Sequence, residues 1–126
     1  MDEIPRIARL DAVTIDCRDP ERLAAFWASV FSTQEEWRGG DPVQYIDLSQ
    51  TEASPGLRLQ RVPEPKTAKD RIHLDLRVED IEEATARVMA LGAKHFSQDD
   101  FHEYNSAFRV MLDPEGNEFC LVMEKD

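Results

Sequence analysis

The sequence predicts an α+β fold in which two βαβββ modules form a curved sheet around a cleft. Residues 71–78 alternate strictly between apolar and polar side chains, which is the pattern of a strand with one buried face and one polar face. Asp19 and Asp80 lie 61 positions apart, and each stands where a helix is expected to begin. One strand precedes and three strands follow each expected helix, so the chain contains an internal repeat.

The composition restricts the class of protein. The chain has 126 residues, which suits one domain with its own core. Its net charge of -11 argues against binding to nucleic acid or to an anionic membrane surface, because both attract basic proteins. No apolar run approaches the roughly 18 residues of a membrane span, and no signal-peptide core is visible. Cys17 and Cys120 form no paired motif, so we expect reduced thiols in a cytoplasmic protein.

The first module is expected over residues 8–62, beginning with a strand at 10–17. Asp19 and Pro20 then begin a helix, because aspartate accepts hydrogen bonds from free N–H groups and proline suits the first helical position. The apolar stripe of this helix recurs at helical spacing and comprises Leu23, Phe26, Trp27, Val30 and Phe31. Turn-forming clusters separate the three strands that follow, which are expected at 35–38, 43–49 and 57–62.

A linker over residues 63–70 contains two prolines, which disfavour a regular strand ladder. The second module is expected over 71–124, so that a single domain spans 8–124. Asp80 caps its helix, Glu83 completes a capping box, and the helix is expected to end at Gly92. The buried stripe of this helix comprises Ile81, Ala84, Val88 and Leu91. Strands are expected at 93–97, 107–112 and 117–123, and the polar segment 98–106, with His102 and Tyr104, is expected to be a loop.

Each module alone leaves one face of its sheet uncovered, and two such faces can curve together with the helices outside. The polar face of each strand is then expected to line the cleft. The cleft residues are Ala12, Thr14, Asp16, Arg58, Gln60, His73, Asp75, Arg77, Glu118 and Cys120. Those expected to bind a ligand are Thr14, Arg58, Gln60, His73, Arg77, Glu118 and Cys120. For the two arginines, the alternative is salt bridging to Asp16, Asp75 or Glu118.

His73 and Asp75 are the candidate catalytic residues. A histidine beside a carboxylate can serve as a general base, because its pKa lies near working pH. The two side chains share one face of the strand, about 7 Å apart along it. The alternative is a histidine that is hydrogen-bonded within the sheet and has no chemical role. Cys120 is either a nucleophile whose pKa His73 lowers, or a small buried hydrophobic residue, which is the commoner fate of a cysteine.

Four segments spread over most of the chain lie at residues 19–27, 61–66, 72–76 and 113–119 and form a recognisable set. Together they resemble the vicinal oxygen chelate superfamily, which is the glyoxalase, bleomycin-resistance and extradiol-dioxygenase group. More narrowly, they are similar to its glyoxalase-like domains. The resemblance implies the two-module fold derived above. It also implies a cleft for a small molecule and a homodimer.

The resemblance further implies a divalent metal held by His, Gln or Glu on the first strand of each module and by Glu on the last. The matching positions here are Ala12, Gln60, His73 and Cys120. Only His73 keeps a ligand type typical of its position, and a metal site normally takes three or four good protein ligands. No family-type metal is therefore expected. If one binds, the expected ligands are His73, Gln60 and Cys120.

Three functions remain open from the sequence. The first is a small-molecule binding protein without a complete family-type metal site. The second is a lyase, isomerase or dioxygenase-type enzyme that uses an atypical divalent metal site or acid–base chemistry at His73 and Asp75. The third is an interaction domain whose cleft has closed.

Overall fold

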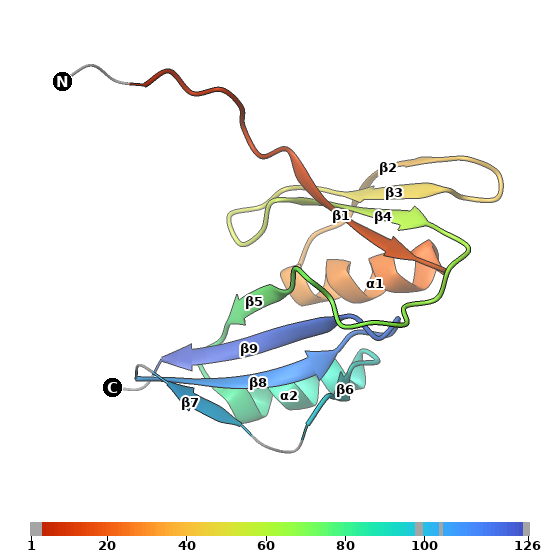
Figure 1. The fold of residues 1–126 in the computed structure, drawn as a ribbon. Helices are drawn as coiled ribbons and strands as arrows, with labels where there is room; N and C mark the ends of the chain where they lie inside the picture. The colour runs from red at the N-terminus through yellow and green to blue at the C-terminus, as the bar shows by residue number, and fades with distance from the viewer. Residues whose placement is uncertain (1–3, 98–99, 104, 125–126) are drawn as a thin grey trace.

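The computed structural model describes residues 4–97, 100–103 and 105–124 (Figure 1). The first module contains β1 (Ala12–Cys17), α1 (Pro20–Phe31), β2 (Glu35–Gly39), β3 (Tyr45–Leu48) and β4 (Gly56–Arg61). Its four strands form one sheet in the order β1-β4-β3-β2. Strand β1 runs parallel to β4, and the other pairs are antiparallel. This is the predicted strand, helix and three strands.

The second module repeats this topology. It contains β5 (Leu74–Arg77), α2 (Ile81–Ala90), β6 (Lys94–His95), β7 (Phe101–Glu103), β8 (Ser106–Leu112) and β9 (Glu118–Glu124). The sheet order is β5-β9-β8-β6, with β5 parallel to β9 and with β7 paired to β8. Strand β7 lies in the segment expected to be a loop, where three residues are too few to produce a recognisable alternation.

Both helices begin where the sequence predicted. The Asp19 carboxylate accepts a hydrogen bond from the backbone N–H of Arg22 at 3.2 Å. The Asp80 carboxylate accepts from the backbone N–H groups of Glu82 and Glu83 at 3.0 and 3.1 Å. Two caps 61 positions apart therefore mark the start of each modular helix, as the internal repeat required.

The core forms around α1, which lies between the first sheet and the strands of the second module (Figure 1). Trp27 is only 1% exposed, and its ring packs edge-on against Phe26 and Phe119 at 5.0 and 5.2 Å. Its indole N–H donates to the buried carboxylate of Asp113 at 3.3 Å. The predicted apolar stripe of α1 therefore also joins the two modules.

The alternating faces of the strands are as expected over most of both sheets. Leu57 and Leu59 on β4 are 2% and 0% exposed, and Phe119 and Leu121 on β9 are 1% exposed each. The intervening residues Arg58 and Cys120 face away from this core and are half-buried. The apolar residues of both sheets therefore pack toward the helices.

The strand predicted at 71–78 is shorter in the structure, where β5 covers only Leu74–Arg77. Ile72, expected to be buried, is 79% exposed. The reason lies in Asp70 and Glu118, which exchange two hydrogen bonds between backbone N–H groups and carboxylates at 3.1 and 3.0 Å. These bonds hold the end of the linker against β9 before the β5 ladder begins. His73 is thus placed immediately before the strand.

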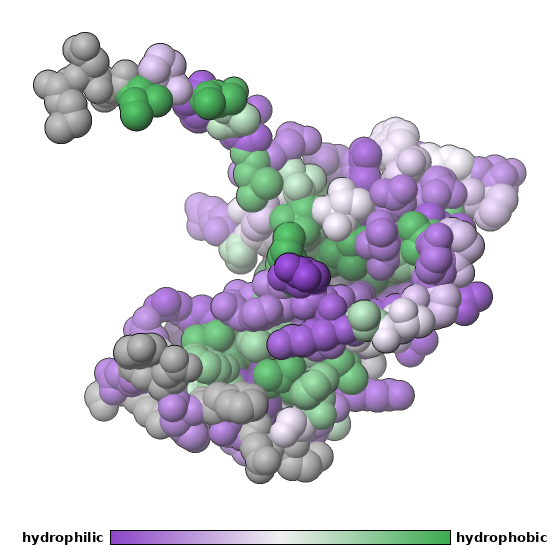
Figure 2. Space-filling model, viewed as in Figure 1, coloured by the Kyte–Doolittle hydropathy of each residue, from purple (hydrophilic) through white to green (hydrophobic). Residues whose placement is uncertain are grey.

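The N-terminal segment before β1 extends away from the body of the molecule (Figures 1 and 2). Its apolar residues Ile4, Ile7 and Leu10 are 90%, 99% and 70% exposed. Figure 2 shows patches of green, hydrophobic surface on this projecting arm, next to hydrophilic surface. Within the described residues, no helix is long and apolar enough to cross a bilayer.

Candidate functional site

Two cavities lie along β1 and β5, and Val13, His73 and Leu74 line both of them. The larger has a volume of about 690 Å³, which falls within the range of small-molecule pockets, roughly 300–1,000 Å³. Most of its lining is apolar and includes Val13, Phe31, Leu57, Leu76, Val88 and Leu121. Phe31 and Val88 lie on α1 and α2, and the other four belong to the helix-facing sides of the sheets. The larger cavity therefore opens beside α1 and α2, whereas the sequence pattern placed the cleft on the polar faces.

The structure divides the residues that were expected to bind a ligand. His73, Asp75 and Arg77 line the larger cavity. Thr14, His73 and Glu118 line the smaller one, whose volume is about 410 Å³. Arg58, Gln60 and Cys120 line neither of these two cavities. His73 is thus the predicted site residue that adjoins both spaces.

Glu118 is engaged within the protein. Its carboxylate accepts from Lys66 Nζ at 3.0 Å and from the backbone N–H of Asp70 at 3.1 Å. Burial alone raises the pKa of this carboxyl, but the hydrogen bonds from Asp70 and Lys66 outweigh burial and lower it to about 2. Burial and the neighbouring Glu118 carboxylate raise the pKa of Asp70. Glu118 therefore stays ionised and fastens the linker to β9.

His73, Asp75 and Cys120 form a compact cluster. His73 Nε2 lies 3.2 Å from Asp75 Oδ1. Asp75 stands opposite Cys120 in the β5–β9 ladder, and the candidate ligand atoms of the three residues lie within 4.8 Å of one another. Burial, reinforced by the nearby Asp75 carboxylate, raises the pKa of the Cys120 thiol to about 11. The thiol is therefore protonated at neutral pH, which makes it a poor nucleophile.

A model of the glyoxalase-like domain family matches residues 12–122. This range begins with β1 and ends within β9, the last strand. The chain belongs to the glyoxalase-like domain family. No curated protein sequence matches it.

Several solved structures share the fold of this glyoxalase-like domain. A glyoxalase/bleomycin resistance protein/dioxygenase family enzyme from Burkholderia phytofirmans PsJN is 21% identical, with a TM-score of 0.75 over 93% of this chain and 99% of the other. The fosfomycin resistance protein FosX from Listeria monocytogenes is 15% identical, with a TM-score of 0.73 over 95% and 96%. TioX from Micromonospora sp. ML1 is 18% identical, with a TM-score of 0.65 over 93% and 99%. At these identities the likeness shows the fold alone.

The side chains of this glyoxalase-like domain do not fit a family-type metal. Ala12 has no donor atom, and Gln60 lines neither of the cavities that His73 adjoins. Cys120 has to lose a proton before it can ligate, and its pKa of about 11 opposes that loss. His73 and Asp75 are exposed and pair with each other. Such a set falls short of the three or four good ligands that a stable site requires.

The two predicted anion-binding arginines have acidic partners that the sequence did not identify. Arg58 binds both carboxylate oxygens of Asp47 at 2.7 and 2.9 Å. Its guanidinium lies 5.7 Å from the Trp37 ring centre and 5.1 Å from that of Tyr45. Arg77 Nη1 lies 2.7 Å from Glu124. Arg58 on β4 lies opposite Asp47 on β3 because of the register in which these two strands pair. The sequence alone did not define that register.

Sequence reasoning missed Arg87, which lines the larger cavity from α2. Arg87 is exposed and forms no hydrogen bond or ion pair with any residue in the described part of the chain. A signal for it was present, because Arg87 follows Ala84 by three positions and precedes Leu91 by four. Residues at these spacings share one helix face, and Ala84 and Leu91 also line the cavity.

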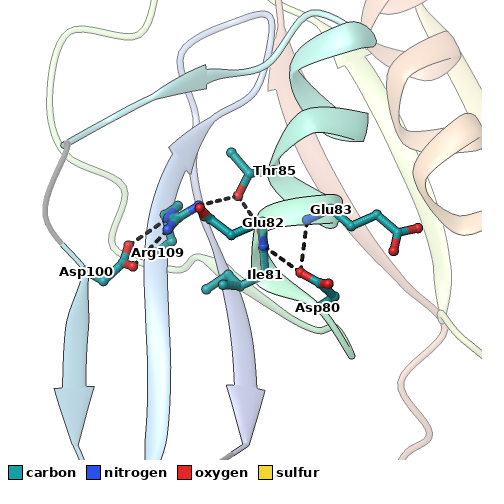
Figure 3. Close-up of polar contacts among 7 residues, drawn as sticks. All are labelled: Asp80, Ile81, Glu82, Glu83, Thr85, Asp100 and Arg109. Atoms are coloured by element: carbon teal, nitrogen blue, oxygen red, sulfur yellow. Dashed lines mark hydrogen bonds and ion pairs between the residues drawn. The ribbon is translucent and has the colours of Figure 1, made fainter.

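A network of polar contacts holds α2 against the second sheet (Figure 3). Arg109, on β8, binds both carboxylate oxygens of Asp100 at 2.6 and 2.8 Å and also pairs with Glu82. It donates to the Thr85 hydroxyl at 2.8 Å, which in turn donates to the Ile81 carbonyl at 2.6 Å. The network ties the segment expected to be a loop to the helix that carries Arg87.

Proposed function

We propose that this glyoxalase-like domain binds a small organic molecule in the larger cavity and does so without a family-type metal. The observation that carries this proposal is the open space of about 690 Å³, walled by apolar side chains and bordered by His73. Such a combination of an apolar wall with a few polar groups is typical of ligand sites. The open cavity argues against the interaction domain with a closed cleft.

A second candidate function is acid–base catalysis on a molecule bound in the same cavity. His73 Nε2 lies 3.2 Å from Asp75, and both residues line the cavity. A neutral imidazole carries one lone pair that can accept a proton from a bound acid, and a carboxylate at this distance stabilises the imidazolium that forms. The reaction class that suits this pair is a lyase or isomerase step that begins with proton abstraction.

The binding proposal is tested by filling the cavity. Ala84, on α2, lines the cavity and is partly buried, whereas Ala86, on the same helix, is exposed and lines neither cavity. Titration with the neutral fluorescent dye N-phenyl-1-naphthylamine is expected to saturate at one site per chain. Ala84→Phe is expected to weaken binding at least about tenfold, because the ring occupies the space that the dye needs.

Ala86→Phe is the matched control, because it adds the same ring to the solvent side of α2 and is expected to leave dye affinity unchanged. Melting temperatures of both variants establish that each is folded. Dye binding that never saturates in the wild-type protein, or that Ala84→Phe leaves intact, contradicts the proposal.

A further inference from the structure

We infer that the ligand of the larger cavity is an organic acid, with an apolar body and one anionic group that Arg87 binds. This inference rests on the proposed function, because it concerns the same cavity. It assigns a specificity-determining role to a residue outside the His73, Asp75 and Cys120 cluster.

The charged groups around the cavity single out Arg87. The cavity lining contains four ionisable residues, which are His73, Asp75, Arg77 and Arg87. His73 and Asp75 pair with each other at 3.2 Å, and Arg77 pairs with Glu124 at 2.7 Å. Arg87 has no such partner among the described residues. Among the residues that the structure describes, the guanidinium of Arg87 is therefore the one positive charge at the cavity without an acidic partner.

Arg87 has no acidic partner among the described residues, although the chain is rich in acidic residues. The chain has 26 aspartates and glutamates, and Glu83 stands four residues before Arg87 on α2. A glutamate four residues before a basic residue is the favourable order for an ion pair on a helix. No such pair forms between these two residues in the described structure. The guanidinium thus remains available to a group in the cavity.

The position of Arg87 in the last turn of α2 has another explanation, which must be separated from ligand binding. A cation near a helix C-terminus is stabilised by the helix dipole. That effect accounts for a basic residue at this end of the helix. The interaction with the helix dipole does not require the side chain to border a cavity. A basic residue at another exposed position of the same turn would be stabilised equally well.

The arrangement of the cavity fits a molecule with two chemically different ends. Leu57 and Leu121 are 2% and 1% exposed and form the deep part of the apolar wall, whereas Arg87 is exposed at the rim. A guanidinium presents a planar pair of N–H donors that matches the two oxygens of a carboxylate. An apolar body can therefore fill the cavity while its acid group meets Arg87.

Two dyes with one body test this inference. N-phenyl-1-naphthylamine is neutral, and 8-anilino-1-naphthalenesulfonate carries the same rings and one sulfonate. The wild-type protein is expected to bind the sulfonate about tenfold more tightly, because a charge-assisted hydrogen bond is gained. Arg87→Met is expected to remove this preference and to leave the affinity for the neutral dye unchanged.

Arg22→Met is the matched control. Arg22 is exposed on α1 and lines neither cavity, so its replacement changes the net charge equally without altering the site. If Arg22→Met lowers sulfonate affinity as much as Arg87→Met does, the effect is long-range and the inference is overturned. If the neutral dye saturates one site and Arg87→Met has no effect on either dye, the inference fails while the proposed function stands. If neither dye saturates, both fail.

Discussion

Replacing Thr85 with valine removes one hydroxyl from a buried site and leaves the shape of the side chain almost unchanged. Thr85 is 6% exposed, and its hydroxyl accepts from Arg109 Nη1 at 2.8 Å. A hydrogen bond to a charged group contributes about 1.5–3 kcal/mol. Arg109 keeps its bonds to Asp100 and Glu82. The valine variant therefore loses this contact and the hydrogen bond that the hydroxyl donates to the Ile81 carbonyl at 2.6 Å. We therefore expect Thr85→Val to lower the free energy of unfolding by about 2 kcal/mol.

Urea denaturation followed by circular dichroism measures this change. For a domain of this size, a loss of 1 kcal/mol lowers the melting temperature by roughly 4 °C, so a decrease of roughly 8 °C is expected for the valine variant. Thr85→Ser keeps the hydroxyl and is expected to retain most of the stability. A double-mutant cycle with Arg109→Met isolates the contact, and the two changes should not be additive.

Two outcomes contradict this reasoning. In the first, the free energy of unfolding of Thr85→Val lies within about 0.5 kcal/mol of the wild-type value, which is the usual range for a surface substitution that breaks no specific contact. In the second, Thr85→Ser, which keeps the hydroxyl, is as unstable as Thr85→Val, so that loss of the hydroxyl does not by itself explain the lower stability.

The remaining predictions concern the carboxyl pair and the metal. Asp70→Asn is expected to raise the free energy of unfolding at pH 7, because the raised pKa of Asp70 means that its ionisation costs stability as pH rises. Glu118→Gln is expected to lower it, because a pKa of about 2 means that the ionised carboxylate contributes stability that is lost as pH falls from about 4.5 to 2. Urea denaturation from pH 3 to 8 tests both, and equal signs for the two variants contradict the assignment. Metal-free protein is expected not to bind zinc, nickel or manganese with micromolar affinity, because Ala12 has no donor atom and the raised pKa of the Cys120 thiol weakens its ligation. Calorimetry that shows one bound equivalent, which His73→Ala abolishes, disproves this.

The parts of the fold that local sequence patterns encode were predictable. Asp19 and Asp80 mark the two helix starts, since a cap depends only on the three residues that follow it. The alternation of Leu57 and Leu59 with Arg58 identified the buried face of β4 for the same local reason. Ile72 shows the limit of such patterns. It continues the alternation of β5, yet β5 begins only at Leu74. The hydrogen bonds between Asp70 and Glu118 hold the segment that precedes the strand against β9.

The candidate site was predictable only in part. His73 and Asp75 were identified because they share one face of a strand, and the structure places them 3.2 Å apart. For Arg58 and Arg77 the sequence left ligand binding and salt bridging open. In the structure they pair with Asp47 and Glu124, which the sequence did not identify as partners. These partners depend on how β3 pairs with β4 and how β5 pairs with β9, and the register of such pairs is defined only in the folded chain.

The sequence by itself determined the helix caps and the buried face of most strands, because each follows from residues close together in the chain. The distance of 61 positions between the two caps also determined the repeated module. Only the tertiary structure decided where the larger cavity opens and which groups border it. The cavity depends on how α1, α2, β1 and β5 pack, and these elements come from both modules. Long-range packing opens the cavity beside the helices and places Arg87, which has no partner among the described residues, at its border.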